Sequence, residues 1–425
     1  MAHRSLPDLW STLATVDAVH GPYYLLMHGL FAVLTYADPL LVMRLPSVLA
    51  MAAATAGVVL LGSRLAGPGP GLLAGFAFAL LPAVQRYAQE GRSYAMVCAL
   101  VVWATYALVR TVSARRACSW DWAGYGTLMS AACLLHEFAV LALAVHAMAV
   151  PRGARRGWAI ASAGVVVTLA PLAALSTSQS QQVAWIGVDA GAYVSFLVVS
   201  ALGVVCARTL PRRPTRPVDL RRLALALLVV PSVLLMLLSV VQPLYVDRYV
   251  LYGNAGLALL MGAALHRLGP SRWMRAAAAV AVLTLVPTTL QLRDTTSRTD
   301  DVTAVARAIQ VLGEPGDGVL YMPQRRRVWS LPYPAAVRGL HDLALDRTPV
   351  ASRTLYGTEV SATGIRARML NSSRIVAVGD PDGEPLDRGA QEAVKRDVLA
   401  TFFEGCVTRR VQGARITLYA RPGEC

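Results

Sequence analysis

The sequence is poor in charged residues. Of its 425 residues only 15% are Asp, Glu, Lys or Arg, whereas a soluble domain typically carries about 25%. This scarcity, together with a hydrophobic content of 55%, excludes an ordinary soluble enzyme and a disordered or collagen-like chain. Lysine occurs once, at Lys395, so the formal charge of +15 comes from arginine. The six cysteines lack the spacing of metal ligands, so no zinc site is predicted.

Long apolar runs fill much of the chain instead. A membrane-spanning helix needs about 20 apolar residues, within a range of about 17–25. Apolar runs of roughly this size, several of them short, are separated by Pro, Gly and arginine clusters. They cover residues 45–63, 72–84, 93–109, 122–135, 138–150, 158–175, 190–207, 223–241, 250–265 and 276–292. We therefore expect an all-α polytopic membrane bundle of about ten transmembrane helices.

The arginines favour one orientation in the membrane. One alternating set of loops is rich in arginine, and it includes Arg64, Arg110, Arg115, Arg116, Arg152, Arg155, Arg156, Arg208, Arg221, Arg222 and Arg267. The positive-inside rule places this set in the cytoplasm, so its basic charge orients a membrane protein and does not indicate a nucleic-acid partner. The other loops and both termini then face outward. An outward N-terminus without a preceding apolar span leads us to expect that a first helix is missing from this sequence.

The chain changes character after about residue 293. Its hydrophobic runs shrink to strand length at Gly318–Met322, Arg374–Val378 and Arg415–Ala420, while 300–312 and 391–403 have helical spacing. This pattern predicts a small extracytoplasmic α/β domain over 293–425. The transmembrane part is expected over 44–292, and an outward loop with a surface helix over 1–43.

Two cysteines lie in the domain predicted outside the cytoplasm, where disulfides form readily. Cys406 and Cys425 are therefore a plausible bridge, and two free thiols are the alternative. The other four cysteines lie in or beside apolar runs and are interpreted as packing residues.

Polar and aromatic residues gather in the loops predicted to face outward. Three loops stand out: 17–24, with Asp17 and His20; 85–94, with Glu90, Arg92 and Tyr94; and 242–249, with Arg248 and Tyr249. His136 and Glu137 form a fourth polar site between two short apolar runs. Ionisable residues near membrane depth are costly and are usually functional. Arginine can bind phosphate bidentately, and histidine with carboxylates can hold a divalent cation such as Mg²⁺ or Mn²⁺.

Each of these residues also has an ordinary interpretation. Arg92 and Arg248 can extend to lipid headgroups, and Glu90 can form a structural ion pair with a nearby arginine. Asp17 can cap a helix, and tyrosines are typical of the membrane interface. His136 and Glu137 can brace the bundle. The common outward face of all these loops is the stronger argument for a site.

Three runs together resemble a known family. They are His20-Gly-Pro-Tyr-Tyr-Leu-Leu-Met-His28, Met43-Arg-Leu-Pro-Ser-Val-Leu49, and Ala83-Val-Gln-Arg-Tyr-Ala-Gln-Glu-Gly-Arg-Ser-Tyr94. In order and topology, residues 1–292 resemble the C-type (GT-C) membrane glycosyltransferases, in the bacterial branch of protein O-mannosyltransferases and aminoarabinose transferases. Residues 242–249 look like a later outward loop of actinobacterial members. In the family, the first outward loop usually carries the catalytic acid in an Asp-Glu or Asp-x-Asp motif. This sequence has no such motif there, and Asp8 is the only acid before Asp17.

The resemblance implies transfer of a sugar, most directly mannose, from a polyprenyl-phosphate donor. The acceptor would be a cell-envelope glycan, lipid or protein at the extracytoplasmic face. On this interpretation Asp17 and Glu90 are catalytic candidates, and Asp17 with His20 could bind a cation. The donor phosphate would be bound by Arg92, Arg248, His20, Tyr94 and Tyr249, while His136 and Glu137 would orient these groups or the acceptor. A lipid-linked sugar transporter and a catalytically inactive scaffold remain alternatives.

Overall fold

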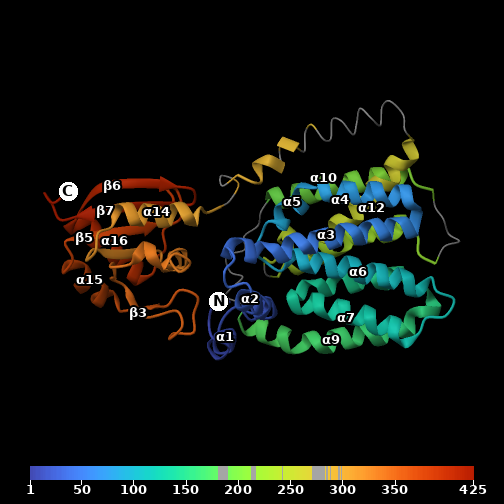
Figure 1. Cartoon of the computed structure of the whole chain (residues 1–425), viewed down its shortest axis with the longest axis horizontal. Helices are drawn as coiled ribbons and strands as arrows, with labels where there is room; N and C mark the ends of the chain where they lie inside the picture. Colours follow the sequence, from blue (N-terminus) through green and yellow to red (C-terminus); the bar gives the residue numbers. More distant parts are fainter. Residues whose placement is uncertain are drawn as a thin grey trace. The chain divides into compact units, whose positions relative to one another are not determined.

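The computed structural model describes the chain except residues 180–189, 212–216, 242, 270–282, 284–285, 288, 295–296 and 298. It divides into two compact units. Residues 17–292 form a helical bundle, and residues 3–16 together with 293–425 form an α/β unit. The bundle comprises α2 to α12, and the α/β unit comprises α1 and α14 to β7 (Figure 1).

The bundle consists of long apolar helices joined by short 3₁₀ turns. Its α-helices are α2 (Gly21–Val33), α3 (Pro39–Ala66), α4 (Pro68–Leu80), α5 (Pro82–Ala88), α6 (Tyr94–Val112), α7 (Ser119–Leu135), α8 (Ala142–Ala149), α9 (Arg155–Ser178), α10 (Ala190–Arg208), α11 (Leu220–Leu238) and α12 (Gly253–Leu268). Its 3₁₀ turns are η1 (Ala18–His20), η2 (Glu137–Leu141), η3 (Arg152–Ala154) and η5 (Asp247–Val250).

Within the described residues, five helices are long and apolar enough to cross a membrane: α3, α6, α9 with η3, α10 and α11. The pair α4 and α5, bent by 63°, adds a sixth if it is one span. The chain is therefore a multi-pass membrane protein, and its described residues contain five or six full-length spans where ten were predicted for the whole chain. The difference arises because α7 and α12 have only 17 and 16 residues, and because most of the run 276–292 lies outside the described residues.

Local chemistry sets two helix ends that the apolar runs did not predict. Helix α3 begins at Pro39, before the predicted run at 45, because Asp38 accepts hydrogen bonds from the amides of Leu40 (2.7 Å) and Leu41 (3.2 Å). The predicted run 72–84 is interrupted between α4 and α5, where Pro82 opens the second helix. This break begins the polar segment 85–92.

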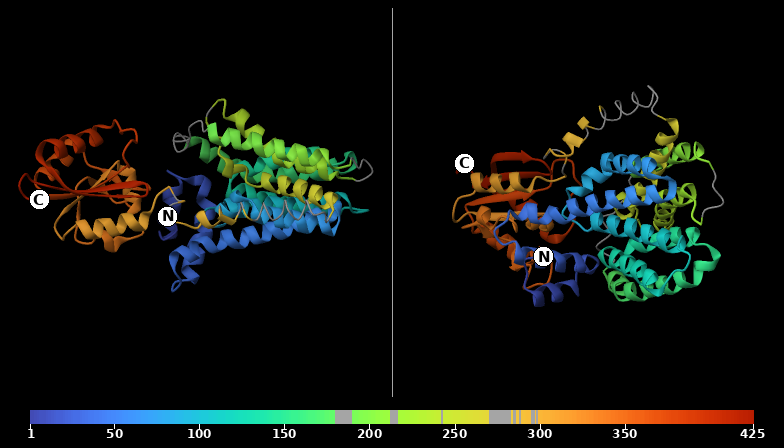
Figure 2. Two further views of the ribbon diagram at one scale, coloured as in Figure 1. Left: turned by 90° about the horizontal axis from the view of Figure 1, so that it is seen from above. Right: turned by 45° about the vertical axis from the view of Figure 1, so that its right-hand side comes forward.

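Small residues allow the central helices to approach closely. Helix α4 packs against α3 and α12, and α6 lies between α3 and α7 (Figures 1 and 2). A Cβ on Gly62 of α3 would lie 2.9 Å from the Cα of Gly71 in α4. A Cβ on Gly262 of α12 would lie 2.3 Å from the amide nitrogen of Ala74. Such contacts are typical of helix interfaces in membranes, where small residues replace hydrophobic burial as the basis of packing.

The α/β unit is built on a five-stranded mixed sheet of order β2-β1-β5-β7-β6. The strands are β1 (Gly318–Met322), β2 (His341–Asp342), β5 (Arg374–Gly379), β6 (Glu404–Val411) and β7 (Ala414–Ala420), and a small hairpin pairs β3 (Leu345–Arg347) with β4 (Thr358–Glu359). Strands β2, β1 and β5 are parallel, and β7 is antiparallel to β5 and β6. This domain confirms the predicted α/β fold class.

The helices of this unit cover both faces of the sheet. They are α1 (Leu6–Leu13), α14 (Val302–Leu312), α15 (Ala362–Leu370) and α16 (Ala390–Phe402), with the 3₁₀ turns η7 (Gln324–Trp329) and η8 (Pro334–Val337). One apolar core joins α14 and η7 to the sheet through Ile309 and Trp329. The other joins α15 and α16 through Ile365 and Leu399. The first chain segment belongs here too, because Arg4 donates to the carbonyl of Thr354 at 2.6 Å.

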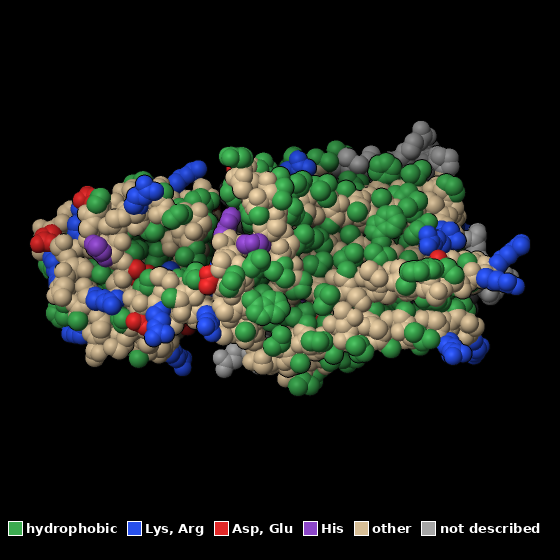
Figure 3. All heavy atoms as spheres, turned by 60° about the horizontal axis from the view of Figure 1, so that its bottom comes forward, with side chains coloured by type: hydrophobic (Ala, Val, Ile, Leu, Met, Phe, Trp, Pro, Cys, Tyr) green, Lys and Arg blue, Asp and Glu red, His purple; other side chains and the backbone are tan. Residues whose placement is uncertain are grey.

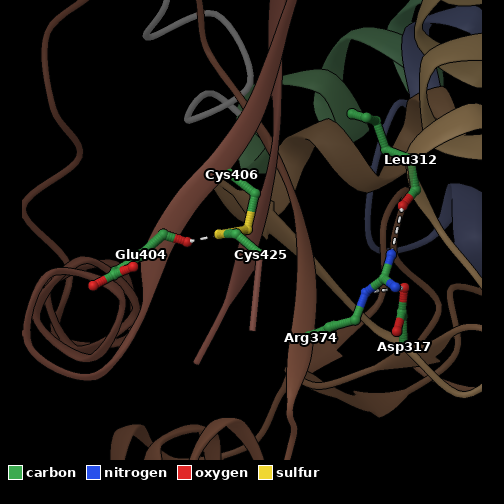
Figure 4. Close-up of a disulfide and its surroundings, with 6 residues drawn as sticks. All are labelled: Leu312, Asp317, Arg374, Glu404, Cys406 and Cys425. Carbon is green, nitrogen blue, oxygen red and sulfur yellow. Dashed lines mark hydrogen bonds and ion pairs between the residues drawn. A yellow bond between two sulfur atoms is a disulfide. The ribbon is translucent and has the colours of Figure 1, made fainter. Parts of the chain in front are cut away.

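A disulfide connects Cys406 on β6 to Cys425, the pair considered from the sequence (Figure 4). Nearby, Arg374 on β5 contacts Asp317 at 3.5 Å and the carbonyl of Leu312 (Figure 4). Arginine–carboxylate pairs of this kind recur through the α/β unit.

Candidate active site

Residues from four separate segments meet at one end of the bundle. These segments are η1, the α5–α6 loop, the α7–η2 junction and η5. They lie on the same side because η5 contacts both η2 and α6, and η1 contacts α7. The predicted outward loops are therefore together in space. The arginine-rich segments lie at the opposite helix ends, as Arg110 in the last turn of α6 illustrates. Figure 3 shows Lys and Arg side chains gathered at one end of the bundle and hydrophobic side chains along its visible flank.

An aromatic cluster forms the centre of this site. The ring of His136 lies 4.5 Å from that of Tyr249 and 5.5 Å from that of Tyr94, measured between centroids. Tyr94 and Tyr249 are 6.0 Å apart, and His20 approaches His136 to 6.1 Å. The cluster thus joins four of the candidates from four different segments. Phe138 extends it, with its ring 5.4 Å from Tyr249.

The two candidate arginines lie beside these rings. The guanidinium carbon of Arg248 lies 5.6 Å from the ring centroid of Tyr94 and also 5.6 Å from that of Tyr249. Cation–π contact of this kind fixes the direction of the guanidinium. Arg92 is exposed and interacts electrostatically with Tyr94 and Asp17 among others. Both arginines therefore border the same polar and aromatic region.

A hydroxyl group on α3 shapes the loop that carries Glu90 and Arg92. Ser47 is fully buried, and its Oγ donates to the carbonyl of Glu90 at 2.6 Å, with the carbonyl of Arg92 at 3.2 Å. Backbone carbonyls in this turn thereby find a hydrogen-bond donor. The half-buried Glu90 and the exposed Arg92 are consequently displayed from one anchored turn.

Asp17 has an unusual backbone and two side-chain neighbours. Its φ is +63°, in the left-handed region that non-glycine residues rarely adopt. Its carboxylate accepts a short hydrogen bond from the hydroxyl of Tyr24, and Oδ1 lies 3.9 Å from Nε2 of His20. The following amide, of Ala18, donates to Oε1 of Gln179 at 2.9 Å, which ties η1 to α9. Strained residues held by their surroundings occur preferentially at functional sites.

The two histidines of the site differ in their surroundings. Burial lowers the pKa of His20 below its ordinary value of 6.5; Asp17 opposes this effect, whereas Arg92 and Arg248 reinforce it. His136 is buried, with 3% of its surface exposed, and in the described part of the chain its Nδ1 has no hydrogen-bond partner. An orphaned ring nitrogen is costly and becomes satisfied when a polar ligand reaches it.

Other placements were not predicted. Glu137 accepts a hydrogen bond from the hydroxyl of Ser176 on α9 at 2.7 Å. Asp247 was overlooked: its Oδ1 accepts from the hydroxyl of Tyr87 at 3.1 Å and from the amide of Arg248 at 2.8 Å. The sequence could have indicated Asp247, because it directly precedes the candidate Arg248. Tyr24 was likewise visible in the run 20–28, but its contact with Asp17 depends on the turn at η1.

The candidate cation site is incomplete. Asp17 and His20 provide two donor side chains, and the carboxylate of Asp17 is already engaged by Tyr24. Within the described residues no group of three or more His, Cys, Asp or Glu side chains is placed to hold a metal ion. The residues present do not by themselves form a coordination sphere, so no chemical step is assigned to a metal here.

Comparison with other proteins identifies the fold. No protein-family profile and no curated protein sequence matches this chain. Solved structures do: ArnT from Cupriavidus metallidurans bound to undecaprenyl phosphate matches with a TM-score of 0.60 at 12% identity, over 93% of this chain and 87% of that one. The apo form of the same ArnT gives a TM-score of 0.61 at 12% identity, over 93% and 86% of the two chains.

Two larger proteins are also similar. The mycobacterial arabinofuranosyltransferase AftD matches with a TM-score of 0.50 at 17% identity, over 95% of this chain and 35% of AftD. The oligosaccharyltransferase of Archaeoglobus fulgidus, in complex with Zn and sulfate, matches with a TM-score of 0.50 at 12% identity, over 94% and 64% of the two chains. At these identities the similarity concerns the fold alone. The chain has the fold of these membrane glycosyltransferases, a GT-C helical bundle followed by a small α/β domain.

Proposed function

We propose that the protein is a membrane glycosyltransferase that transfers a sugar from a polyprenyl-phosphate donor to an acceptor at the extracytoplasmic face. The observation that carries this proposal is the convergence of Arg248, Arg92, His20 and Asp17 around one aromatic cluster at one end of the bundle. The solved ArnT that shares this fold contains undecaprenyl phosphate, a lipid of the class we propose. The arginine-rich segments at the opposite end favour a cytoplasmic location for that end.

The leaving group explains the need for two arginines. As the bond between the anomeric carbon and the phosphate oxygen breaks, the electron pair stays on polyprenyl phosphate and its negative charge increases. Arg248, held over Tyr94 and Tyr249, and Arg92 would stabilise this charge. A neutral His20 would donate a hydrogen bond to the phosphate without adding charge. Arg248 is half-buried, where the effective dielectric constant is lower than in water, so its attraction to the phosphate is stronger.

Asp17 is the base that we propose for the acceptor. A hydroxyl oxygen of the acceptor attacks the anomeric carbon, and its proton passes to the carboxylate of Asp17. The hydroxyl of Tyr24 and the left-handed backbone would hold that carboxylate in one orientation. Glu90, on the anchored turn beside Arg92, would orient the arginine or take the acceptor. His136, with its unsatisfied Nδ1, would bind a hydroxyl of the donor or acceptor.

The sugar is proposed from resemblance and fold. The sequence runs similar to those of protein O-mannosyltransferases make mannose the first donor to test, and the likeness in fold to an arabinofuranosyltransferase makes a pentose the second. The acceptor would be a glycan, lipid or protein of the cell envelope. An assay with both polyprenyl-phosphate mannose and polyprenyl-phosphate pentose decides which sugar is transferred.

The test is a transfer assay on the full chain in detergent, with radiolabelled polyprenyl-phosphate mannose or pentose and a cell-envelope extract. We expect Arg248→Ala to reduce transfer by about 10²–10³-fold and Asp17→Asn by about 10²–10⁴-fold, both without loss of folded protein. Arg86→Ala is the matched control: this arginine is exposed on α5, at the same end of the bundle, and lies over Tyr87 at 5.7 Å.

Three results would contradict the proposal. Normal transfer by both Arg248→Ala and Arg92→Ala would remove the assigned phosphate site. Absence of transfer with every donor, combined with movement of a lipid-linked sugar across proteoliposomes, would favour a transporter instead. Equal losses in Arg86→Ala and Arg248→Ala would mean that general positive charge at this end of the bundle, and not the position of Arg248 over Tyr94 and Tyr249, is what matters.

A further inference from the structure

A pocket of about 360 Å³ lies in the α/β unit, within the size range of small-molecule sites of about 300–1,000 Å³. Its floor is the face of β7 that carries Arg415, Thr417 and Tyr419. Helix α16 forms one wall through Arg396, Leu399 and Ala400, and the segment 380–387 covers it. No residue of this pocket belongs to the site in the bundle.

The position of the pocket follows from the topology of the sheet. From β1 the chain passes to β2 on one side and later to β5 on the other, so the strand order reverses between β1 and β5. After β1 the chain continues into η7 on the face covered by α14, and after β5 it leads to α16 on the opposite face. Met322 and Gly379, opposite each other at the carboxyl ends of these strands, both border the pocket. Ligands of open α/β sheets bind in the crevice at such a switch point.

The covering segment is already held in place. Arg325 forms ion pairs with Asp380 (2.8 Å) and Asp387 (2.7 Å), at the two ends of the segment. Between them, Asp382 accepts from Arg415 at 2.6 Å and from Arg410 at 3.0 Å. A ligand would therefore enter a largely preformed pocket and would not have to order the loop, which favours binding.

The paired charges indicate which ligand fits. A cation would have to compete with arginines for the carboxylates of Asp380, Asp382 and Asp387, and an anion would have to compete with these carboxylates for Arg415. A neutral polyhydroxyl compound can donate hydrogen bonds to the carboxylates and accept them from the guanidinium groups at the same time. Tyr419, half-buried on the pocket floor, and Leu399 offer apolar surface for the C–H face of a sugar ring.

We propose that this pocket binds a neutral glycan segment, and that in the reaction it binds a part of the acceptor chain other than the hydroxyl that receives the sugar. The second half of this statement rests on the proposed function; the first half does not. Because the pocket is remote from the arginines of the bundle site in sequence and unit, its loss should affect acceptor binding and leave donor binding unchanged.

The experiment is direct binding to the full chain, purified in an amine-oxide detergent, because detergents with sugar headgroups would compete. Neutral oligosaccharides derived from arabinan, galactan and mannan are tested by saturation-transfer NMR and calorimetry. We expect at least one of these to bind. Tyr419→Ala should weaken it about tenfold, and Ala400→Trp, which fills the pocket from α16 without changing a charge, should abolish it. Arg347→Ala, an exposed arginine of β3, is the control and should stay within about twofold of the unmodified protein.

The outcomes separate this inference from the proposed function. If no neutral oligosaccharide binds, or if Tyr419→Ala and Ala400→Trp bind as well as the control, the inference is wrong, even if transfer occurs. Binding of inorganic phosphate or Ca²⁺ in place of sugars, lost in the same variants, would also overturn it. If sugars bind but no donor supports transfer, the pocket stands and the proposed function fails. With both intact, Tyr419→Ala should raise the acceptor KM and leave the donor KM unchanged.

Discussion

The two units of this protein use charged residues in different ways. In the α/β unit, arginines face carboxylates: Arg327, with 3% of its side chain exposed, contacts both Asp342 at 2.6 Å and Glu359 at 3.0 Å. In the bundle, Arg248 lies over two tyrosine rings, and Asp17 receives a tyrosine hydroxyl. Ion pairs in the first unit neutralise charge within the fold. In the second, ring contacts fix the direction of the Arg248 guanidinium, as a site for a charged ligand requires.

The largest effect is expected at Lys395, which tests whether buried ion pairs stabilise the α/β unit. The only lysine of the chain is fully buried, and its Nζ contacts Glu359 (2.8 Å), Glu392 (2.8 Å) and the carbonyl of Tyr321 (2.9 Å). Lys395→Met leaves buried carboxylates without this cation, so the unfolding free energy of the α/β unit should fall by about 3–5 kcal/mol. Hydrogen exchange of β1 and α16 measures the loss in this unit alone. Unchanged exchange would show that the pair does not hold the fold together.

The same substitution tests whether the units are independent. Because Lys395 contributes no group to the bundle site, α6 and α12 should keep their exchange protection in Lys395→Met. Arg366→Ala serves as the control within the domain, since Arg366 forms an exposed pair with Asp397 at 3.2 Å and such pairs contribute about 0–1 kcal/mol.

The disulfide should contribute somewhat less than the buried lysine. The bridge between Cys406 and Cys425 closes a loop with a sequence separation of 19, for which loss of unfolded-state entropy stabilises by about 3 kcal/mol. Replacing both cysteines with serine should therefore lower the unfolding midpoint of the α/β unit and leave that of the bundle unchanged. Cys118→Ser, at an exposed cysteine of the bundle, is the matched substitution. Equal effects of the two changes on the α/β unit would contradict this assignment.

The convergence of the outward loops could be predicted from the sequence, because it depends on helix order. Once apolar helices alternate in direction, loops such as those of Arg92 and Arg248 share one end of the bundle. Strands such as Gly318–Met322 were also predictable, since short β-branched runs bounded by turns suffice. The disulfide pair followed from the predicted compartment.

Contacts across long stretches of chain were not predictable. The hydrogen bond from Arg4 to Thr354 places the first helix with the α/β unit, and no local pattern encodes a contact over that separation. The contact of Tyr24 with Asp17 depends on the left-handed backbone of Asp17, which aspartate tolerates better than most residues but which no local pattern here predicts. Apolar composition also does not give helix lengths: α7 and α12 have 17 and 16 residues.

The smallest expected effect concerns His20, whose lowered pKa should make the stability of the bundle depend on pH. Its pKa in the folded protein lies below 6.5, chiefly because burial disfavours the charged ring, and Arg92 and Arg248 add to this. As the pH falls through about 6.5, the unfolded chain binds a proton at His20 whereas the folded chain does not. The contribution of His20 to the unfolding free energy of the bundle should therefore rise with pH between the lowered pKa and 6.5, with a slope of up to about 1.4 kcal/mol per pH unit.

His20→Gln should remove this part of the pH dependence while keeping a hydrogen-bonding side chain. Thermal unfolding midpoints of the full chain, followed across the range below pH 6.5, measure it. His266→Gln, an exposed histidine in the last turn of α12, is the control and should keep the original slope. An unchanged slope in His20→Gln would show that folding does not lower the pKa of this ring. A steeper slope would show that folding favours the charged ring. The bundle site would then carry a third cation beside its arginines, and the contrast between ring-oriented charge here and paired charge in the α/β unit would need revision.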